Sequence, residues 1–375
     1  MIRKQLTLQY RLSPKMLDDF RAYLPYCAEE GTDFDVRCDK QLKIDYTCNG
    51  EQDVPSIETA IRKLMDALCG TGEPAPMEKK VIFDNRSAVC QQLEIFEDLL
   101  GGGHLIKFGE GQYGMGKTFL TVFKYFERGC YRLALQQNPE EYVYPIMIPT
   151  DYLKQCDYSN TPSTTFFSAG FGSGQAPEDA KYQPRHAGKP AVCLHCYPHF
   201  ENKVITRPVT ITTQGRCYRY EPANVPPDIC PGMNLWEFIM RESIYLGTAT
   251  FVRERLENIR HLTEAWMVRL GIRCWIETAD DLFFAKDPAV VRKTRLVKEN
   301  KYELRVCLPK TSLAAASFNF HGPHFSKAFN INDGRNYIAT GCAGFGIERL
   351  TYAFLSQYGL QADQWPQTIQ EEIKQ

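Results

Sequence analysis

Apolar residues recur at two different periods in the first hundred residues of the chain. In residues 57–69 they return every three or four positions, as on one face of a helix. Strand-like runs flank this helix, at residues 5–12, 42–47 and 80–83. We therefore expect residues 1–98 to form a small α/β appendage, for which the sequence offers no chemistry.

A glycine cluster at residues 101–103 marks the junction to a second domain, over residues 99–375. After it, residues 118–128 predict an amphipathic helix with Phe119, Phe123 and Phe126 on one side. A proline-punctuated strand is expected next. That strand covers residues 142–149. A long polar loop is expected at residues 157–190, a long helix at 248–270 and a helical C-terminal segment from residue 346.

The composition narrows the classes of function. The 375-residue chain is 43% hydrophobic and has a formal net charge of −1, so it predicts a packed globular protein without a bulk positive field for nucleic acid. No apolar run approaches the roughly 18 residues that span a bilayer, and the polar N-terminus lacks a signal-peptide region, so we expect a cytoplasmic protein. The 14 cysteines are scattered, which favours reduced core residues and a few metal ligands.

Residues 111–118 read Gly-Gln-Tyr-Gly-Met-Gly-Lys-Thr, a literal match to the phosphate-loop pattern. A short apolar run precedes them and a helical pattern follows, as such a loop requires. However, no apolar strand ending in Asp stands out downstream, and no alternating βαβ units follow. We therefore expect a chance match, with a phosphate-loop NTPase as the least favoured alternative.

Two arginine-bearing segments carry the strongest signal. In residues 339–355 a run of small residues leads into an apolar helix with Arg349 in its first turn, which suits a polyphosphate. Residues 215–221 read Gly-Arg-Cys-Tyr-Arg-Tyr-Glu, and an apolar segment follows at 235–248. Each has an ordinary structural explanation, a packing turn or a surface Arg–Glu pair. Taken together and in this order, however, the two segments resemble motif 2 (215–248) and motif 3 (339–355) of a class II aminoacyl-tRNA synthetase core.

The resemblance implies an α+β fold with an antiparallel sheet flanked by helices, and ATP as substrate. Because negative charge develops on the α-phosphate, a fixed guanidinium is the suitable donor there, and Arg219 is the candidate. By resemblance Arg349 holds the γ-phosphate, Glu221 reads the adenine amino group and Phe238 stacks on the adenine ring. The helix and strand after residue 117 are similar to motif 1, which implies a homodimer.

A narrower resemblance, over roughly residues 105–365, is to the zinc-dependent seryl-tRNA synthetases of methanogens and their shortened relatives, the amino acid:[carrier protein] ligases. It implies Zn²⁺ ligated by Cys193, Glu242 and Cys342, with one tetrahedral position open for the substrate amino group. Cys196 lies three residues from Cys193, so the choice between them stays open. The same resemblance places Ser317 and Asn319 at the substrate.

The expected activity follows from these resemblances. A small amino acid is activated with ATP and Mg²⁺ to an aminoacyl adenylate and passed to the phosphopantetheine thiol of a carrier protein, without tRNA. Residues 313–316 lack the acidic residue with which many synthetases bind magnesium. Arginines that could contact an acidic carrier protein are Arg253, Arg255 and Arg260. A solvated helix face is the commoner explanation for arginines in such a pattern. The alternatives are aminoacylation of another acceptor as in seryl-tRNA synthetases and a non-catalytic regulatory paralogue.

Overall fold

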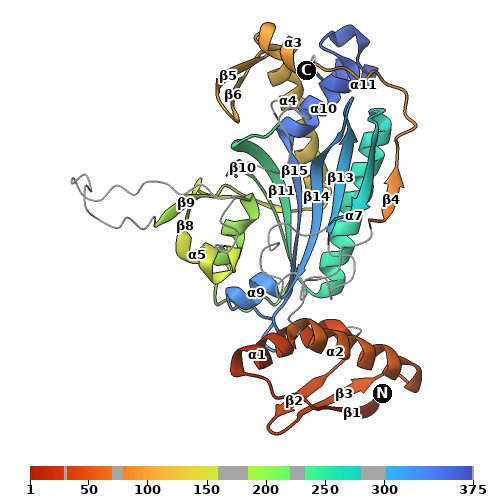
Figure 1. Ribbon diagram of the computed structural model, residues 1–375, viewed down its shortest axis with the longest axis vertical. Coiled ribbons are helices and arrows are strands. Elements are labelled where there is room, and N and C mark those ends of the chain that lie inside the picture. Colours follow the sequence, from red (N-terminus) through yellow and green to blue (C-terminus); the bar gives the residue numbers. More distant parts are fainter. Residues whose placement is uncertain (29–31, 70–78, 159–184, 220–232, 280–300, 374–375) are drawn as a thin grey trace, which may run out of the picture.

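An eight-stranded sheet forms the centre of the molecule (Figure 1). The computed structural model describes residues 1–28, 32–69, 79–158, 185–219, 233–279 and 301–373. Every neighbouring pair in the sheet is antiparallel except β7 and β10, which run parallel. The strands in order across the sheet are β4 (Val81–Asp84), β12 (Cys274–Thr278), β13 (Lys301–Cys307), β14 (Ser312–Gly322), β15 (Ala339–Gly346), β11 (Glu237–Gly247), β10 (Val209–Tyr218) and β7 (Glu140–Tyr142).

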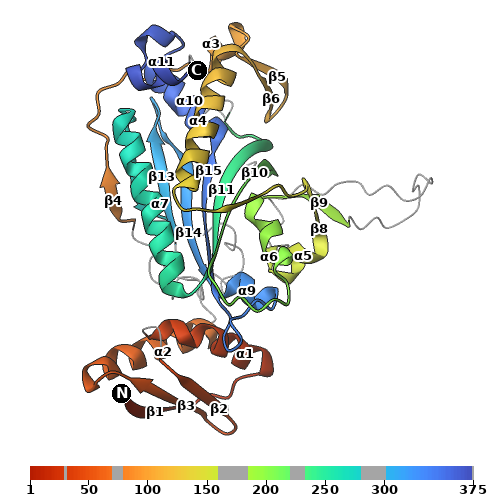
Figure 2. The ribbon, with the colours of Figure 1, turned by 180° about the vertical axis from the view of Figure 1, so that it is seen from behind.

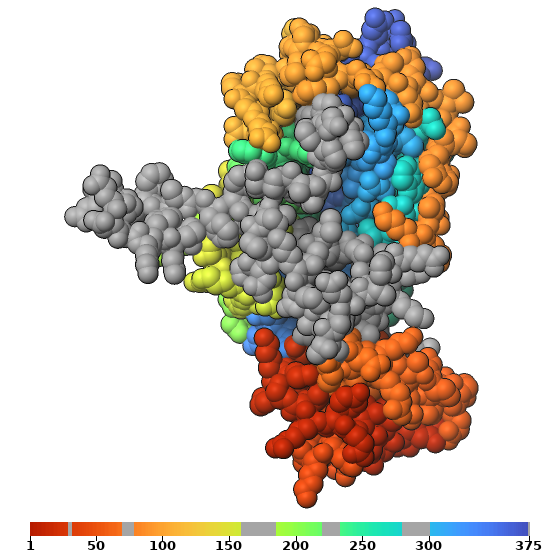
Figure 3. Space-filling model, in the orientation of Figure 1, coloured from red at the N-terminus to blue at the C-terminus, as the bar shows by residue number. Residues whose placement is uncertain are grey.

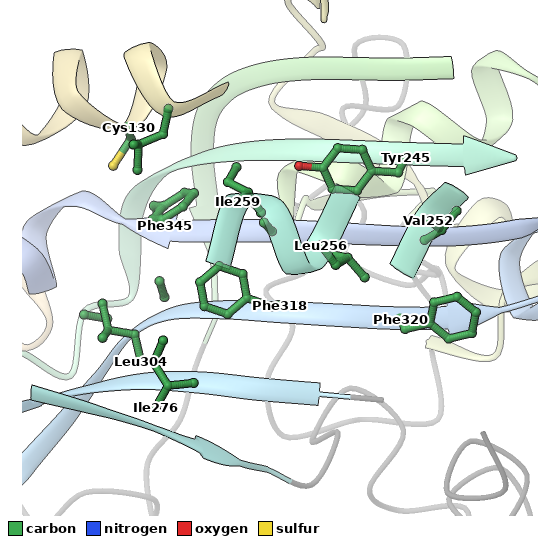
Figure 4. Close-up of a cluster of buried hydrophobic side chains, with 14 of the residues drawn as sticks. Cys130, Tyr245, Val252, Leu256, Ile259, Ile276, Leu304, Phe318, Phe320 and Phe345 are labelled. Carbon is green, nitrogen blue, oxygen red and sulfur yellow. The ribbon is translucent and has the colours of Figure 1, made fainter. Parts of the chain in front are cut away.

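Two long helices cover one face of this sheet, as the view from behind shows (Figure 2). They are α4 (Lys117–Leu135) and α7 (Ala249–Arg269). Side chains alternate between the two faces of the sheet along β15. Phe345 and its odd-numbered neighbours face α7, while Cys342 packs in a separate cluster on the opposite face. Gly341 is required by the close approach of α7, because a Cβ there would lie 2.6 Å from Val252. Figure 4 shows the resulting core between α7 and the sheet.

Shorter elements complete the larger part of the chain. Near the C-terminal end, α10 (Ile347–Tyr358) packs beside α4. Among the described residues of this part, the remaining α-helices are α3 (Phe96–Gly101), α5 (Thr150–Gln155), α6 (Cys196–His199), α9 (His324–Ala328) and α11 (Gln367–Ile373). Two hairpin-like pairs lie outside the main sheet, β5 (Leu105–Gly109) with β6 (Gln112–Met115) and β8 (Met147–Pro149) with β9 (His186–Gly188).

The N-terminal part is a three-stranded antiparallel sheet with two helices, at the far end of the molecule from α3 and α11 (Figure 3). Its elements are β1 (Ile2–Leu8), α1 (Pro14–Tyr23), β2 (Phe34–Cys38), β3 (Leu42–Cys48) and α2 (Val54–Cys69). Among its contacts with the rest of the chain is an ion pair of Lys327, whose Nζ lies 2.8 Å from a carboxylate oxygen of Asp18 and also pairs with Asp19. Among the described residues no helix is long and apolar enough to cross a membrane.

Several sequence expectations needed correction. The strand expected at 5–12 ends at Leu8, because Ser13 caps α1 and Pro14 occupies its first turn. The strand expected within the appendage, β4, pairs instead with β12 of the large sheet. Where the chain divides into domains, after residue 98 or elsewhere, stays a prediction.

The helix expected at 118–128 continues to Leu135, because Gly129 packs against Trp266 and so does not end it. The single strand expected at 142–149 is in fact two short strands, β7 and β8, in different sheets. Pro145 lies between them, and proline cannot donate to a strand ladder. Most of the polar loop expected at 157–190 lies outside the described residues, as does Glu221.

Candidate active site

Two adjoining cavities open on the sheet face opposite α7. The larger, of about 90 Å³, is lined by Arg219, Phe238 and Arg349. The smaller, of about 20 Å³, is lined by Cys193, Glu242 and Cys342 among others. Three residues line both cavities, and they lie on three adjacent strands of the sheet, Met240 (β11), Ser317 (β14) and Gly344 (β15). The structure therefore brings motifs 2 and 3 together at one continuous site.

The larger cavity contains the two arginines that the sequence predicted. Arg219 follows β10, and its guanidinium lies 4.8 Å from the ring centroid of Phe238. Its Nε donates to the carbonyl oxygen of Pro190 at 2.9 Å, which fixes the direction of the side chain. Arg349 is in the first turn of α10 and donates to the carbonyl oxygen of Ala314 at 3.1 Å. Both cations are thus anchored at one end and line the same cavity, as phosphate-binding arginines require.

The three predicted metal ligands lie together in the lining of the smaller cavity. The thiols of Cys193 and Cys342 and a carboxylate oxygen of Glu242 all lie within 4.8 Å of one another, and all three residues are buried. Tetrahedral zinc with these ligands requires separations of roughly 3.6–3.8 Å, so small side-chain shifts suffice. Cys193 comes from the turn before α6, whereas Glu242 and Cys342 come from neighbouring strands.

The donor set also fits a cation chemically. Glu242 Oε1 accepts the backbone N–H of Val192 at 3.0 Å, while the buried Oε2 has no hydrogen-bond partner within the described residues. An orphaned carboxylate oxygen beside two thiols is costly unless an ion or a ligand meets it. Burial raises the pKa of Glu242, and the neighbouring Cys342 thiol together with burial raises that of Cys193. The two thiols and the carboxylate therefore lie together in one desolvated place, and we call the Cys193–Glu242–Cys342 cluster the metal corner.

The structure separates the two candidate cysteines. Cys196 is buried, but its thiol faces the Tyr144 hydroxyl and it does not belong to the Cys193–Glu242–Cys342 cluster. Burial raises its pKa well above the ordinary range. One turn of backbone thus points the two sulfurs into different surroundings, and Cys193 is the one that faces Glu242.

The predicted substrate residues lie on β14 beside the cluster. Asn319 is paired across the sheet with Cys342, and its Nδ2 donates to the Cys342 sulfur at 3.5 Å and to Ser317 Oγ at 3.1 Å. Its buried Oδ1 has no partner within the described residues. Because Asn319 lines the smaller cavity, this oxygen is an acceptor available to a bound amino or hydroxyl group.

Two further residues of the site were not recognised from the sequence. His321 lines the smaller cavity, and its Nε2 lies 3.7 Å from the Cys342 sulfur. Burial lowers its pKa to about 3, which keeps the ring neutral. Glu348 lines the larger cavity, and burial raises its pKa to about 7. Period-two spacing of Ser317, Asn319 and His321 would have indicated the first, but nothing local marks Glu348.

Magnesium does not fit the strand where many synthetases bind it. The β14 residues that line the larger cavity are the alanines at 314–316 and Ser317, and none of them carries a carboxylate. The carboxylate of Glu303 lines the cavity from β13, but it is paired with Lys301 at 3.2 Å and with Arg305 at 3.5 Å. We therefore assign no protein ligand to magnesium.

The phosphate-loop match at 111–118 has the wrong geometry. Gln112–Met115 form β6, which pairs antiparallel with β5, and Lys117 donates its Nζ to the carbonyl oxygen of Gly102. A phosphate loop instead follows a buried strand and wraps its backbone N–H groups around the phosphates. The segment is a hairpin leading into α4.

The α7 arginines also have local partners. Arg260 pairs with Glu264 and lies 3.6 Å from Glu257, with a side chain only 13% exposed. Arg255 lies over the ring of Phe251 at 5.2 Å, and Arg253 over the ring of Phe320 at 4.0 Å. These contacts favour a structural role, most clearly for Arg260.

The comparison with known proteins agrees with the geometry. No protein-family model matches the sequence. A type-2 serine–tRNA ligase of Methanococcus aeolicus is 30% identical over 207 residues, which cover 52% of this chain and 39% of that protein. Amino acid–[acyl-carrier-protein] ligase 1 of Bradyrhizobium diazoefficiens is 27% identical over 194 residues, 48% of this chain and 56% of that protein. The matched region thus spans well under half of the methanococcal relative.

The fold likeness extends further. The crystal structure of M. kandleri SerRS in complex with A. aeolicus tRNASec superposes with a TM-score of 0.68 at 18% identity, over 99% of this chain and 77% of that one. The chain therefore has the fold of a class II synthetase core. This confirms the α+β fold with an antiparallel sheet that motifs 2 and 3 predicted, and it leaves substrate and acceptor to be argued from the site.

Proposed function

We propose that this protein activates a small amino acid with ATP and transfers it to the phosphopantetheine thiol of a carrier protein. One observation carries the proposal. The Cys193–Glu242–Cys342 corner adjoins the arginine-lined cavity through Met240, Ser317 and Gly344. An amino group held at the corner would therefore direct its carboxylate toward phosphates held by the arginines.

Cys193, Glu242 and Cys342 would hold zinc, with the fourth position left open. When bound, the zinc supplies a Lewis-acid position for the substrate's α-amino group. The orphaned Oδ1 of Asn319 would accept a hydrogen bond from the same substrate. The cavity of about 20 Å³, whose lining includes Tyr158 and Phe325, favours an amino acid with a side chain no larger than a few atoms.

The arginines would then serve the first chemical step. A carboxylate oxygen of the amino acid attacks the α-phosphorus of ATP, the bond to the bridging oxygen of the β-phosphate breaks, and pyrophosphate leaves. Arg219 would stabilise the charge that develops on the α-phosphate, and Arg349 would hold the γ-phosphate. Phe238 is available to the adenine ring, while the proposed role of Glu221 concerns a residue outside the described part of the chain. Magnesium would enter with the ATP, because it keeps most of its waters and binds mainly to phosphates.

In the second step the carrier's thiolate attacks the aminoacyl carbonyl, and AMP leaves with the bonding electrons of the mixed anhydride. The similarity to a carrier-protein ligase over 48% of the chain and the net charge of −1 support this acceptor. A homodimer through α4 and the strands after it is part of the same proposal.

Transfer of serine to tRNA is the second candidate. It is favoured by the similarity to a type-2 serine–tRNA ligase, which at 30% identity is as strong as any argument for the carrier protein. Both candidates share adenylate formation and differ in the acceptor alone.

One assay in two stages tests these alternatives. Pyrophosphate exchange into ATP with glycine, alanine or serine tests activation, and we expect a strong dependence on one of them. Incubation with radiolabelled amino acid, total tRNA and a phosphopantetheinylated carrier protein then identifies the acceptor. Label on the carrier supports the proposal, and label on tRNA replaces it with the second candidate. Absence of exchange with every amino acid would indicate a non-catalytic regulatory paralogue.

A further inference from the structure

His321 is held rigidly against the proposed metal corner. Its ring packs edge-to-face against Phe325, with centroids 4.9 Å apart and planes at 89°. Phe325 in turn stacks on Tyr197 at 4.0 Å. His321, Tyr197 and Phe325 are all buried, so their packing restrains the orientation of the imidazole. In that orientation Nε2 faces the Cys342 sulfur at 3.7 Å.

The contacts of the opposite ring nitrogen decide where the proton resides. Nδ1 lies 3.3 Å from the Tyr197 hydroxyl and 3.5 Å from Thr340 Oγ1. A hydroxyl can donate to an unprotonated Nδ1, whereas a metal-bound thiolate can only accept. A thiolate at Cys342 therefore selects the tautomer in which Tyr197 donates to Nδ1 and the Nε2–H points at the sulfur.

We infer that His321 is a positioning residue that donates a hydrogen bond to the Cys342 thiolate and is itself oriented by Tyr197. This inference rests on the proposed zinc ligation by Cys193, Glu242 and Cys342. The Nδ2 of Asn319, at 3.5 Å, is a second donor to the same sulfur. Two N–H groups stabilise the thiolate's charge in a buried site and hold its lone pairs in place for the metal, as hydrogen bonds to metal ligands do elsewhere.

The test uses the purified protein loaded with Zn²⁺ or Co²⁺ alone. Zinc affinity is measured by competition with a chromophoric chelator, and the thiolate-to-cobalt charge-transfer band is recorded. Gln places an amide nitrogen near the former Nε2, whereas Asn reaches only the former Nδ1, so His321→Gln and His321→Asn are a matched pair. Tyr197→Phe removes only the hydroxyl. His324→Gln is the control, because His324 Nε2 contacts the backbone oxygen of Cys156 instead.

We expect His321→Asn to weaken zinc binding roughly 10–100-fold, with Tyr197→Phe losing less and both His321→Gln and His324→Gln staying near the unmutated protein. In His321→Asn the charge-transfer band should move to longer wavelength, because a sulfur that has lost a donor gives up its electron more easily. Affinity and band unchanged in His321→Asn, in a protein that binds zinc, would overturn the role of His321 alone. An unmutated protein that binds no zinc would overturn the metal assignment as well.

Discussion

The carboxylate of Glu348 accepts the backbone N–H of Ile239 with both of its oxygens, at 2.9 and 3.0 Å. This contact joins the first turn of α10 to β11, 109 residues apart in sequence. Phe238 and Arg349 are the direct neighbours of the two bonded residues. The Glu348–Ile239 contact therefore fixes the spacing of two residues that line the larger cavity.

Glu348 should make stability depend on pH. Burial raises its pKa from 4.5 to about 7, so between these values the folded state binds more protons than the unfolded state. The free energy of unfolding should then fall as pH rises from about 5 to 8, by roughly 3 kcal/mol for this group. Urea unfolding across that range should show the slope in the unmutated protein and a flatter profile in Glu348→Gln. Glu254→Gln, at an exposed position of α7, should leave the slope intact. An equal slope in Glu348→Gln would contradict the assignment.

Arg219→Ala and Arg349→Ala should each reduce amino-acid-dependent pyrophosphate exchange by about 10²–10³-fold, because each removes a fixed cation from a developing phosphate charge. Arg216→Ala is the matched control, because Arg216 lies on β10 three residues before Arg219 and its exposed side chain pairs with Glu237 outside the larger cavity. Lys117→Ala should also have little effect, because Lys117 is exposed and bonded to Gly102. Loss of exchange in Lys117→Ala with activity retained in both arginine variants would restore the phosphate-loop hypothesis.

Removing one ligand should remove the metal. Cys193→Ala and Cys342→Ala should lose stoichiometric zinc when the purified proteins are analysed by mass spectrometry of the metal. Cys196→Ala should retain it, because its sulfur lies outside the cluster although it is equally buried and three residues away. Stoichiometric zinc in Cys342→Ala, or its loss in Cys196→Ala alone, would assign the site to other residues.

Arg241 should stabilise the packing of α4 on the sheet. Its guanidinium lies 2.6 Å from Glu127 and 3.2 Å from Glu141, above the ring of Tyr131, and its side chain is 8% exposed. Arg241→Ala should lower the free energy of unfolding by about 3 kcal/mol, because it leaves a half-buried glutamate unpaired. Arg132→Ala, on the same helix, breaks an exposed pair with Glu372 and should cost less than about 1 kcal/mol. Equal losses in urea unfolding would show that the Arg241 contacts contribute no more than a surface pair.

The sequence by itself determined the class of the fold, and it predicted several of the residues that line the two cavities. Motifs 2 and 3 each combine a local signal, a strand or helix period, with an arginine at a fixed place in it. Such signals can be recognised in the sequence alone, because strand alternation and helix starts depend on residues that are close along the chain. For that reason Arg219 and Arg349 could be singled out before any contact was known, whereas Cys342 was named only through the family resemblance.

The tertiary structure decided what depends on register and burial between distant segments. Only the pairing of β14 with β15 sets Asn319 opposite Cys342, and only the packing of the turn before α6 turns Cys193 rather than Cys196 toward Glu242. The antiparallel pairing of β6 with β5 likewise excluded a phosphate loop, although residues 111–118 match the sequence pattern at every position. His321 and Glu348 act through neighbours that lie 21 and 109 residues away, and no local pattern encodes a contact that long-range packing creates.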